Sequence, residues 1–249
     1  MGSNMEYKMS PKSTFSKEGD TNLLSTKKAA NFTNWMYDEI KPYLRGNILE
    51  LGSGIGTYSE KVVKDFNKNI VVLSDIDQEY IKNLQNKFQS YKNVFVKKID
   101  ISEPEDFSDF KCKINSVFAL NVLEHIYDDV KALNNIYDSL EIGGNLVILV
   151  PAHKFLFNCI DKAIGHYRRY SKEEVISKVM QTKFKIEKMF YFNFAAIPGW
   201  YINGNILRKQ VVSENVISLF NKFIPILKFI ERYIIFHRFG ISLIVVLTK

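Results

Sequence analysis

The 249-residue sequence lacks several features that characterise other classes of protein. It has only two cysteines, Cys112 and Cys159, whose spacing predicts neither a disulfide framework nor a cysteine-based metal site. Although the net charge is +7, no cluster of lysine and arginine is dense enough for a nucleic-acid surface, and we expect no nucleic-acid partner. The polar N-terminus has no apolar stretch of the signal-peptide kind, so we expect a cytoplasmic protein.

The composition predicts one folded domain preceded by an arm. Residues 1–25 are rich in Ser, Lys, Thr and Asn, and we expect a flexible arm that begins with a tag remnant, "MGSN". A hydrophobic content of 46% with 24% charged residues is ordinary for a folded protein. Residues 26–249 are therefore expected to form a single domain.

Short apolar runs alternate with stretches of helical periodicity over the first part of this domain. Strands that are separated by helices pair in parallel, so the pattern predicts an α/β sheet with helices on both faces. The expected strands are "ILEL" at 48–51, then 70–73, 94–97, 117–120 and 145–150, and the expected helices are 26–44, 78–88 and 129–140.

The second part of the domain is interrupted by an insertion. Ser171 and Glu174 have the S-x-x-E spacing of a capping box, which predicts a helix over 172–181. Strands are expected at 184–194 and 240–249, with a helical insertion between them at 195–240.

A glycine-rich loop follows the "ILEL" strand. Glu50, Gly52, Gly54 and Gly56 form the pattern E-x-G-x-G-x-G before a helix, whose free N–H groups suit a ligand. A tight strand-to-helix turn usually needs one glycine, so three alternating glycines favour a ligand loop. The third glycine comes one residue too early for the dinucleotide fingerprint, which argues against NAD.

Aspartates follow the next two strands. Asp75 lies at the distance from the glycines at which such folds use an acidic residue to hold ribose hydroxyls. Asp77 stands where a helix N-cap is expected. Asp100, in "KKID", can accept a hydrogen bond from an adenine amino group, or it can be a turn residue.

The runs "ILELGSGIG", "SDID", "KKID" and "LNVLEHI" in this order resemble the successive motifs of class I S-adenosylmethionine-dependent methyltransferases. The resemblance covers residues 31–154. It implies a doubly wound, seven-stranded Rossmann-like sheet, with S-adenosylmethionine as methyl donor and S-adenosylhomocysteine as product. The donor-site positions that it implies are Glu50, Gly52 and Gly54 at the methionine part, Gly56 in the same loop, Asp75 at the ribose, Ile76 and Ile101 at the adenine faces, Asp100 at the adenine amino group, and Asn121 near the methyl group.

The loop "GHYRRYS" follows the fifth strand, at the edge of the sheet where doubly wound folds bind ligands. We expect it to cover the acceptor pocket. His166 in this loop and His125 in "LEHI" are the candidate bases, because imidazole titrates near neutrality; for His125 a structural role is an equal alternative. Arg168 and Arg169 can bind a phosphate or carboxylate.

Tyr167 and Tyr170 can stack on a sugar, although the alternative is that an arginine pairs with Asp161 and the tyrosines pack. Glu124 and His125 are adjacent in the sequence and are poor chelators without further ligands, so we expect no metal ion.

The motif D-x-x-x-G-H-Y-R-R-Y-S, the "GW" at Gly199 and Trp200 and the later "GISL" are similar to a branch of bacterial methyltransferases often associated with glycosyltransferases of surface-polysaccharide and lipid-linked glycan pathways. This resemblance is one of pathway neighbourhood and constrains the acceptor only weakly. We expect direct methyl transfer to a hydroxyl of a polar, glycan-type or phosphate- or carboxylate-bearing acceptor, either a small molecule or a lipid-linked glycan, with Trp200 in the acceptor site. Two alternatives stay open: a small-molecule N- or O-methyltransferase of secondary metabolism, and a donor-binding protein without catalysis.

Residues 214–236 are expected to form an amphipathic helix with a wide apolar face, kinked or interrupted at Pro225. Charges recur too often for a membrane span. The apolar face is expected either to act as a lid or dimer contact, or to lie on the inner face of a membrane with basic residues toward anionic lipid. A homo-oligomer is compatible with the first of these alternatives.

Overall fold

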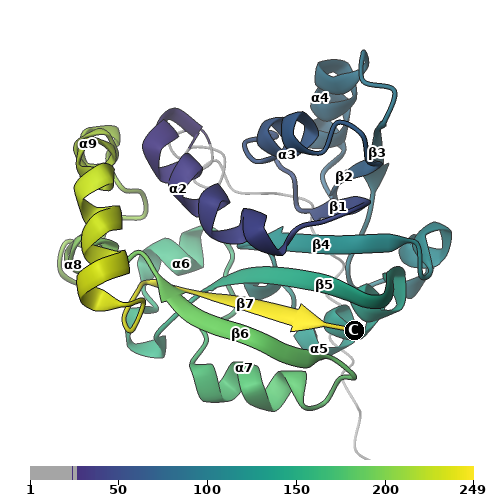
Figure 1. Ribbon diagram of the computed structural model, residues 1–249. Helices are drawn as coiled ribbons and strands as arrows, with labels where there is room; N and C mark the ends of the chain where they lie inside the picture. Colours follow the sequence, from purple (N-terminus) through teal and green to yellow (C-terminus); the bar gives the residue numbers. More distant parts are fainter. Residues whose placement is uncertain (1–23, 25–26) are drawn as a thin grey trace, which may run out of the picture.

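The computed structural model describes residue 24 and residues 27–249, and within them seven strands form one sheet with the order β3-β2-β1-β4-β5-β7-β6 (Figure 1). The expected arm of residues 1–25 lies outside the described residues except for Leu24. The strands are β1 (Ile48–Leu51), β2 (Val71–Asp75), β3 (Val94–Lys98), β4 (Ile114–Leu120), β5 (Leu140–Pro151), β6 (Lys185–Phe192) and β7 (Ser242–Thr248).

Strands β1 to β5 pair in parallel, whereas β7 is antiparallel to both of its neighbours, β5 and β6. The predicted elements occur in the predicted order, and the doubly wound seven-stranded fold is confirmed. The helices are α2 (Ala30–Ile40), α3 (Ser59–Asp65), α4 (Gln78–Phe88), α5 (Asp129–Ser139), α6 (Cys159–Ala163), α7 (Lys172–Val179), α8 (Ala196–Tyr201) and α9 (Glu214–Ile230).

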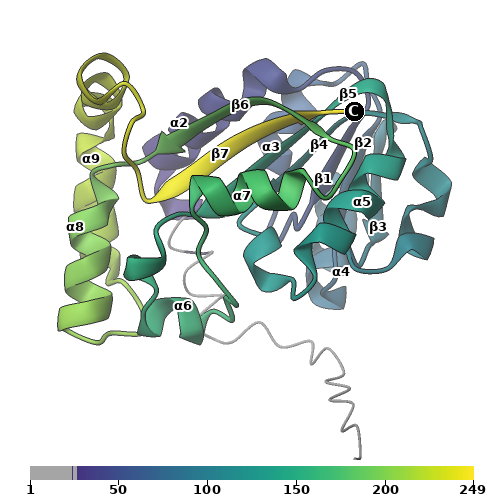
Figure 2. The same cartoon turned by 90° about the horizontal axis from the view of Figure 1, so that it is seen from below.

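Two apolar cores lie on the two faces of the sheet. Ile48 packs with side chains of α2, α3 and α4, whereas its neighbour Leu49 packs with α5 and α7. Successive side chains of a strand point to opposite faces, and a strand that is covered on both sides must be apolar throughout. The continuous run "ILEL" in β1 meets this requirement, with Glu50 as its polar exception. Figure 2 shows α5 and α7 on one face and α2 and α3 behind the sheet.

Two local predictions are corrected. Strand β5 begins at Leu140, because the pair Gly143 and Gly144 lies within an irregular stretch of the ladder with β4 and does not end the strand. At α7, Ser171 Oγ accepts from the backbone N–H of Glu174 as expected, but the Glu174 carboxylate lies 3.0 Å from Lys154 Nζ and does not return to the cap.

The insertion is helical, as predicted, but Pro225 does not interrupt it. Helix α9 runs through Pro225 and continues into a π-helix at Glu231–Ile235. Proline cannot donate to the carbonyl four residues earlier, which belongs to Asn221. That carbonyl accepts instead from Asn31 Nδ2 of α2 at 3.0 Å, so the missing helical hydrogen bond is replaced by a tertiary one.

Candidate active site

A cavity of about 500 Å³ lies beyond the carboxyl ends of β1, β2, β4 and β5. This is the edge at which doubly wound sheets bind ligands, and the volume is in the range of small-molecule sites. Most of the predicted donor-site residues line it. They are Glu50, Gly52, Gly54, Asp75, Ile76, Asp100, Ile101 and Asn121, and from the acceptor-site prediction His125, His166, Arg169 and Trp200 join them.

The glycine loop has the backbone conformation that its sequence predicts. Gly52 has a φ of +71°, and a Cβ atom there would lie 2.5 Å from Val122 Cγ2, so β1 and the residues after β4 approach too closely for a side chain. Gly54 donates its backbone N–H to Asp75 Oδ2 at 2.8 Å. Gly56 does not line the cavity: its Cβ position lies 3.0 Å from Leu84 Cδ2 of α4, so its geometry is that of a packing glycine.

The carboxylates at the donor end are buried. Burial raises the pKa of Glu50 to about 8, although Glu50 Oε2 accepts a hydrogen bond from Ser59 Oγ at 2.6 Å. Burial also raises the pKa of Asp75. The backbone N–H groups of Asp77 and Gly54 donate to this carboxylate and lower its pKa, but the effect of burial is larger. Asp100 lines the cavity and also accepts from the N–H of Ser102 at 2.9 Å, so its position is compatible with both the ligand and the turn interpretation.

This donor end fits a ligand that carries positive charge and hydroxyl groups. A positive group beside Glu50 would offset the burial that raises its pKa. The cavity is otherwise apolar around Ile76 and Ile101, as the faces of an aromatic base require. Asn121, with a φ of +54°, also lines the cavity.

Three residues that line the cavity were not predicted from the sequence. Phe32 and Met36 of α2 and Tyr58 before α3 line the cavity. Phe32 and Met36 occupy the apolar positions of a helical pattern, and such a pattern does not distinguish a residue that faces a cavity from one that faces the core.

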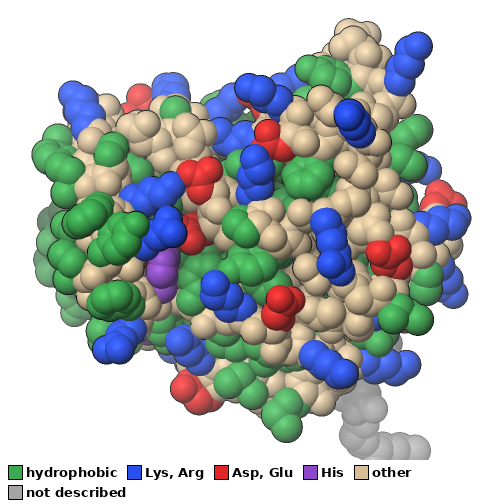
Figure 3. All heavy atoms as spheres, in the orientation of Figure 1, with side chains coloured by type: hydrophobic (Ala, Val, Ile, Leu, Met, Phe, Trp, Pro, Cys, Tyr) green, Lys and Arg blue, Asp and Glu red, His purple; other side chains and the backbone are tan. Residues whose placement is uncertain are grey.

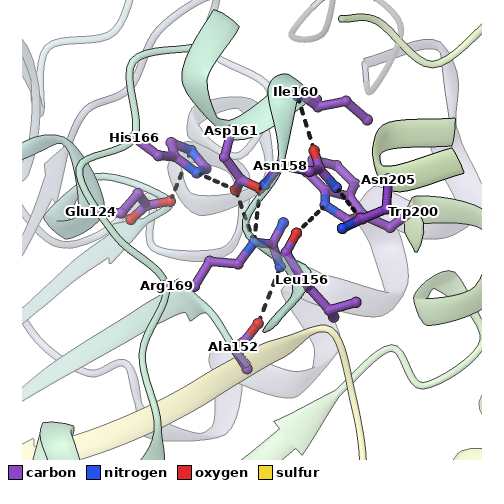
Figure 4. A network of polar contacts seen from close by, with 10 residues as sticks. All are labelled: Glu124, Ala152, Leu156, Asn158, Ile160, Asp161, His166, Arg169, Trp200 and Asn205. Carbon is purple, nitrogen blue, oxygen red and sulfur yellow. Dashed lines mark hydrogen bonds and ion pairs between the residues drawn. The ribbon is translucent and has the colours of Figure 1, made fainter. Parts of the chain in front are cut away.

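The two histidines of the acceptor end lie side by side. The ring centroids of His125 and His166 are 4.7 Å apart and the rings are nearly perpendicular. His166 Nδ1 lies 2.9 Å from Asp161 Oδ1, and its Nε2 lies 3.6 Å from Glu124 Oε1 (Figure 4). Burial lowers the pKa of His125 to about 4, so this imidazole is neutral at neutral pH.

Asp161 links the histidine to the rest of the loop. Its carboxylate accepts from Arg169 Nε at 2.9 and 3.0 Å and from the backbone N–H of Asn158 at 3.0 Å, in a reciprocal capping box at the start of α6 (Figure 4). Burial opposes ionisation, but the hydrogen bond from His166 and the charge of Arg169 outweigh it and lower the pKa of Asp161. Asp161 is therefore an ionised group that holds both His166 and Arg169 in place.

Glu124 is the least satisfied polar side chain of the site. It is fully buried, and neither carboxylate oxygen has a hydrogen-bond partner within the described residues. Burial raises its pKa to about 7. Glu124, His125 and His166 offer ligand atoms within 4.8 Å of one another, so these three residues could hold a metal ion. The expectation that the site needs no metal stays a prediction.

The other residues of the "GHYRRYS" loop face away from the cavity, which corrects their expected place in the acceptor site. Tyr170 is buried, and its Oη donates to Asp129 Oδ2 at 2.9 Å, where Arg168 Nη1 also donates at 2.9 Å. Tyr167 is exposed and packs on the ring of Tyr127. Their physical role is to fix the loop on the first turn of α5.

Arg169 and Trp200 do face the cavity, and they contact each other. The guanidinium carbon of Arg169 lies 4.6 Å from the Trp200 ring centroid, while Trp200 Nε1 donates to the carbonyl of Leu156. Arg169 also pairs with Asp161, as the structural alternative for this arginine predicts. A flat aromatic ring and a cation thus stand at the acceptor end of the cavity.

Residues 49–146 match the protein family described as "Methyltransferase domain". Two curated relatives are malonyl-[acyl-carrier protein] O-methyltransferases 1 and 2 of Ilyobacter polytropus. The first is 23% identical over 163 residues, which are 61% of this chain and 59% of that protein. The second is 27% identical over 149 residues, which are 56% of this chain and 55% of that protein. The chain thus spans less than two thirds of the length of these relatives.

Solved structures share the fold at low sequence identity. Phosphoethanolamine N-methyltransferase 2 of Haemonchus contortus, in complex with S-adenosyl-L-methionine, has a TM-score of 0.61 at 17% identity, with 92% of this chain and 57% of that chain covered. An S-adenosylmethionine-dependent methyltransferase of Mesorhizobium loti has a TM-score of 0.59 at 12% identity, with 86% and 98% covered. The sequence match and the fold point to the same class of domain.

Proposed function

We propose that the chain is a class I S-adenosylmethionine-dependent methyltransferase that transfers a methyl group directly to a hydroxyl of a polar, glycan-type or phosphate- or carboxylate-bearing acceptor. The match of residues 49–146 to the family described as "Methyltransferase domain" supports the methyl transfer. The observation that carries this proposal is a single cavity that joins the carboxylates of the donor end to the pair formed by His166 and Asp161. A reaction that needs one donor, one acceptor and one base is accommodated in that space.

The cofactor of the domain is S-adenosylmethionine, which supplies an electrophilic methyl group on a positively charged sulfur. Glu50 would hold the amino group of its methionine part, because that carboxylate is buried next to the glycine loop at the donor end of the cavity. Asp75 would hold the ribose hydroxyls, and Ile76 and Ile101 would contact the adenine. These residues bind and orient, which is the larger part of catalysis when the donor is already activated.

We assign the removal of the hydroxyl proton to His166. Asp161 accepts from Nδ1–H and so fixes the tautomer in which Nε2 can take a proton. A positioned base of this kind contributes roughly 10² to 10⁴ in rate. Burial lowers the pKa of the neighbouring His125 to about 4, so His125 is a weak base and adds neutral surface to the pocket.

The residues that line the acceptor end of the cavity support the proposed class of acceptor. The Trp200 ring can stack on a sugar, and the adjacent Arg169 cation can attract a phosphate or carboxylate on the same acceptor. A second candidate comes from the names of the curated relatives, which are O-methyltransferases that act on a malonyl group held by an acyl-carrier protein. A small-molecule or carrier-bound carboxyl of secondary metabolism is therefore the alternative acceptor.

Two measurements test the proposal. S-adenosylmethionine is titrated calorimetrically into the parent protein and into Asp75→Ala, and we expect micromolar binding that the variant weakens. Labelled methyl transfer is then measured to a panel of sugars, glycosyl phosphates and malonyl thioesters. Transfer to the sugars supports the proposal, transfer to the thioesters alone favours the alternative, and donor binding without transfer to any of them would indicate a donor-binding protein without catalysis.

A further inference from the structure

The insertion exposes many large apolar side chains. Side chains from α8 to the segment after α9 that would normally be buried stand largely in solvent, and Figure 3 shows hydrophobic side chains gathered over this end of the molecule with lysines and arginines beside them. We call this surface the insertion face. Its apolar members are Tyr201, Ile202, Ile206, Leu207, Leu219, Phe223, Ile226, Phe229, Tyr233, Ile234, Phe236 and Phe239.

Helix α9 is apolar on two sides, and polar residues also attach it to the protein. Ile224 is buried, and Phe220 and Leu227 pack against the core. Asn221 Oδ1 accepts from the backbone N–H of Phe32, Lys228 Nζ donates to Asp38 at 2.7 Å, and the buried Glu231 accepts from two backbone N–H groups after β6. Leu219, Phe223, Ile226 and Phe229 point outward. The helix therefore contacts the protein through both apolar and polar side chains and still presents four large apolar side chains to the surroundings, where a surface helix in water is usually polar.

The charges around the insertion face have one sign. Arg208, Lys209, Lys222, Arg232 and Arg238 are exposed. The two acidic residues of the region do not offset them, because Glu231 is fully buried and Glu214 lies 3.0 Å from Lys28. A surface that combines large apolar side chains with exposed cations is complementary to the headgroup region of an anionic membrane.

We propose that the insertion face docks the protein on an anionic membrane surface, with Leu219, Phe223, Ile226 and Phe229 among the acyl chains and the basic side chains at the headgroups. Among the described residues, no helix has both the length and the apolar character needed to cross a bilayer. The contact that we propose is peripheral. Docking does not depend on the catalytic proposal.

The docked orientation has a consequence for the acceptor, and this consequence does rest on the proposed function. Helix α9 also lines the cavity, through Val216, Ile217 and Phe220. One helix thus separates the cavity from the surface that we place on the membrane. An acceptor carried by a lipid would enter the cavity beside α9 without leaving the membrane, so the inference narrows the acceptor class to lipid-linked molecules.

The test is co-sedimentation of the full chain with phosphatidylcholine vesicles that do or do not contain phosphatidylglycerol. We expect binding to the anionic vesicles, and we expect Phe223→Ser/Ile226→Ser to lower the partition coefficient about tenfold or more, because two large apolar side chains no longer enter the interface. The matched control is Ile142→Ser/Met180→Ser, which removes two exposed apolar side chains elsewhere and should leave the partition coefficient unchanged. Lys222→Gln/Arg232→Gln should weaken binding roughly fivefold for each side chain.

Two results would overturn the inference. The parent protein does not bind anionic vesicles, or the control variant loses as much binding as Phe223→Ser/Ile226→Ser does. A third outcome would assign the face to a second copy of the chain: the parent is a dimer without lipid, ignores vesicles, and becomes a monomer in the Phe223→Ser/Ile226→Ser variant. Calorimetric binding of S-adenosylmethionine to each variant shows that it is folded and keeps a failure of docking distinct from a failure of the donor site.

Discussion

Binding of S-adenosylhomocysteine should release a proton from Glu50. In the free protein burial holds the pKa of this carboxyl at about 8, so roughly nine tenths of the molecules carry it protonated at pH 7. The amino group that we place beside it is positive and favours the ionised form. The reaction product is the better probe, because without the sulfonium its amino group stays protonated over this pH range.

The direction and the size of the pH effect on S-adenosylhomocysteine affinity follow from proton linkage. Below pH 8 binding must expel the Glu50 proton, so affinity should rise about tenfold for each pH unit between 6 and 8 and level off above. Calorimetry at pH 7 in buffers of different ionisation enthalpy should give about 0.9 proton released per ligand. Glu50→Gln should bind more weakly at pH 8, release no proton and show a flat pH profile.

The reasoning fails if the parent releases no proton at pH 7, or if Glu50→Gln retains the same pH dependence. The first result would mean that Glu50 is already ionised in the free protein. The second would mean that another group titrates on binding.

Four further predictions concern the same site and its supports. His166→Ala should lower turnover about 10²- to 10⁴-fold while donor binding persists, and unchanged turnover would reject His166 as the base. Gly52→Ala should destabilise the protein by about 1–3 kcal/mol in a thermal or denaturant melt, because the residue has a positive φ and no room for Cβ, whereas Gly199→Ala, at a helical position with nothing within 4 Å, should not. Tyr170→Phe should cost about 1–1.5 kcal/mol of unfolding free energy, since one buried hydrogen bond to Asp129 is lost and the ion pairs of Asp129 remain; no change would refute the loop-anchoring role. Removing divalent metal ions with a chelator should leave turnover unchanged, and a loss that zinc or manganese restores would establish a metal centre at the histidines.

The order of elements and the donor end could be predicted because both depend on local pattern. Apolar runs of strand length fix β1 to β5, and the position of Asp75 after β2 follows from the same pattern. Parallel strands bring their carboxyl ends to one edge, so Gly52, Asp75 and Asp100 had to meet there.

The acceptor end could be predicted only in part, because its partners are distant in the sequence. Arg168 and Tyr170 are oriented by Asp129 of α5, whose carboxylate accepts a hydrogen bond from each of them. Asp129 is about 40 residues away in the sequence, so the local pattern of the loop does not reveal this contact. The sequence also did not predict which side of α9 faces the protein and which faces solvent. A polar stripe usually marks the solvent side of a helix. The side chains of Asn221 and Glu231 instead accept hydrogen bonds from backbone N–H groups of the protein.

The position of β7 has a consequence for the order in which the fold can be completed during synthesis. Strand β6 borders the sheet through β7, to which it pairs along its length, and β7 follows it in the chain only after α8 and α9. During synthesis β6 leaves the ribosome before β7 does. Strand β6 therefore has no strand to pair with, and the apolar insertion has no completed sheet beside it, until residues 242–248 emerge. Exposed strand edges and apolar helices attract chaperones and other chains at this stage. A membrane surface close to the site of synthesis would shelter the same helices that we propose it binds in the finished protein.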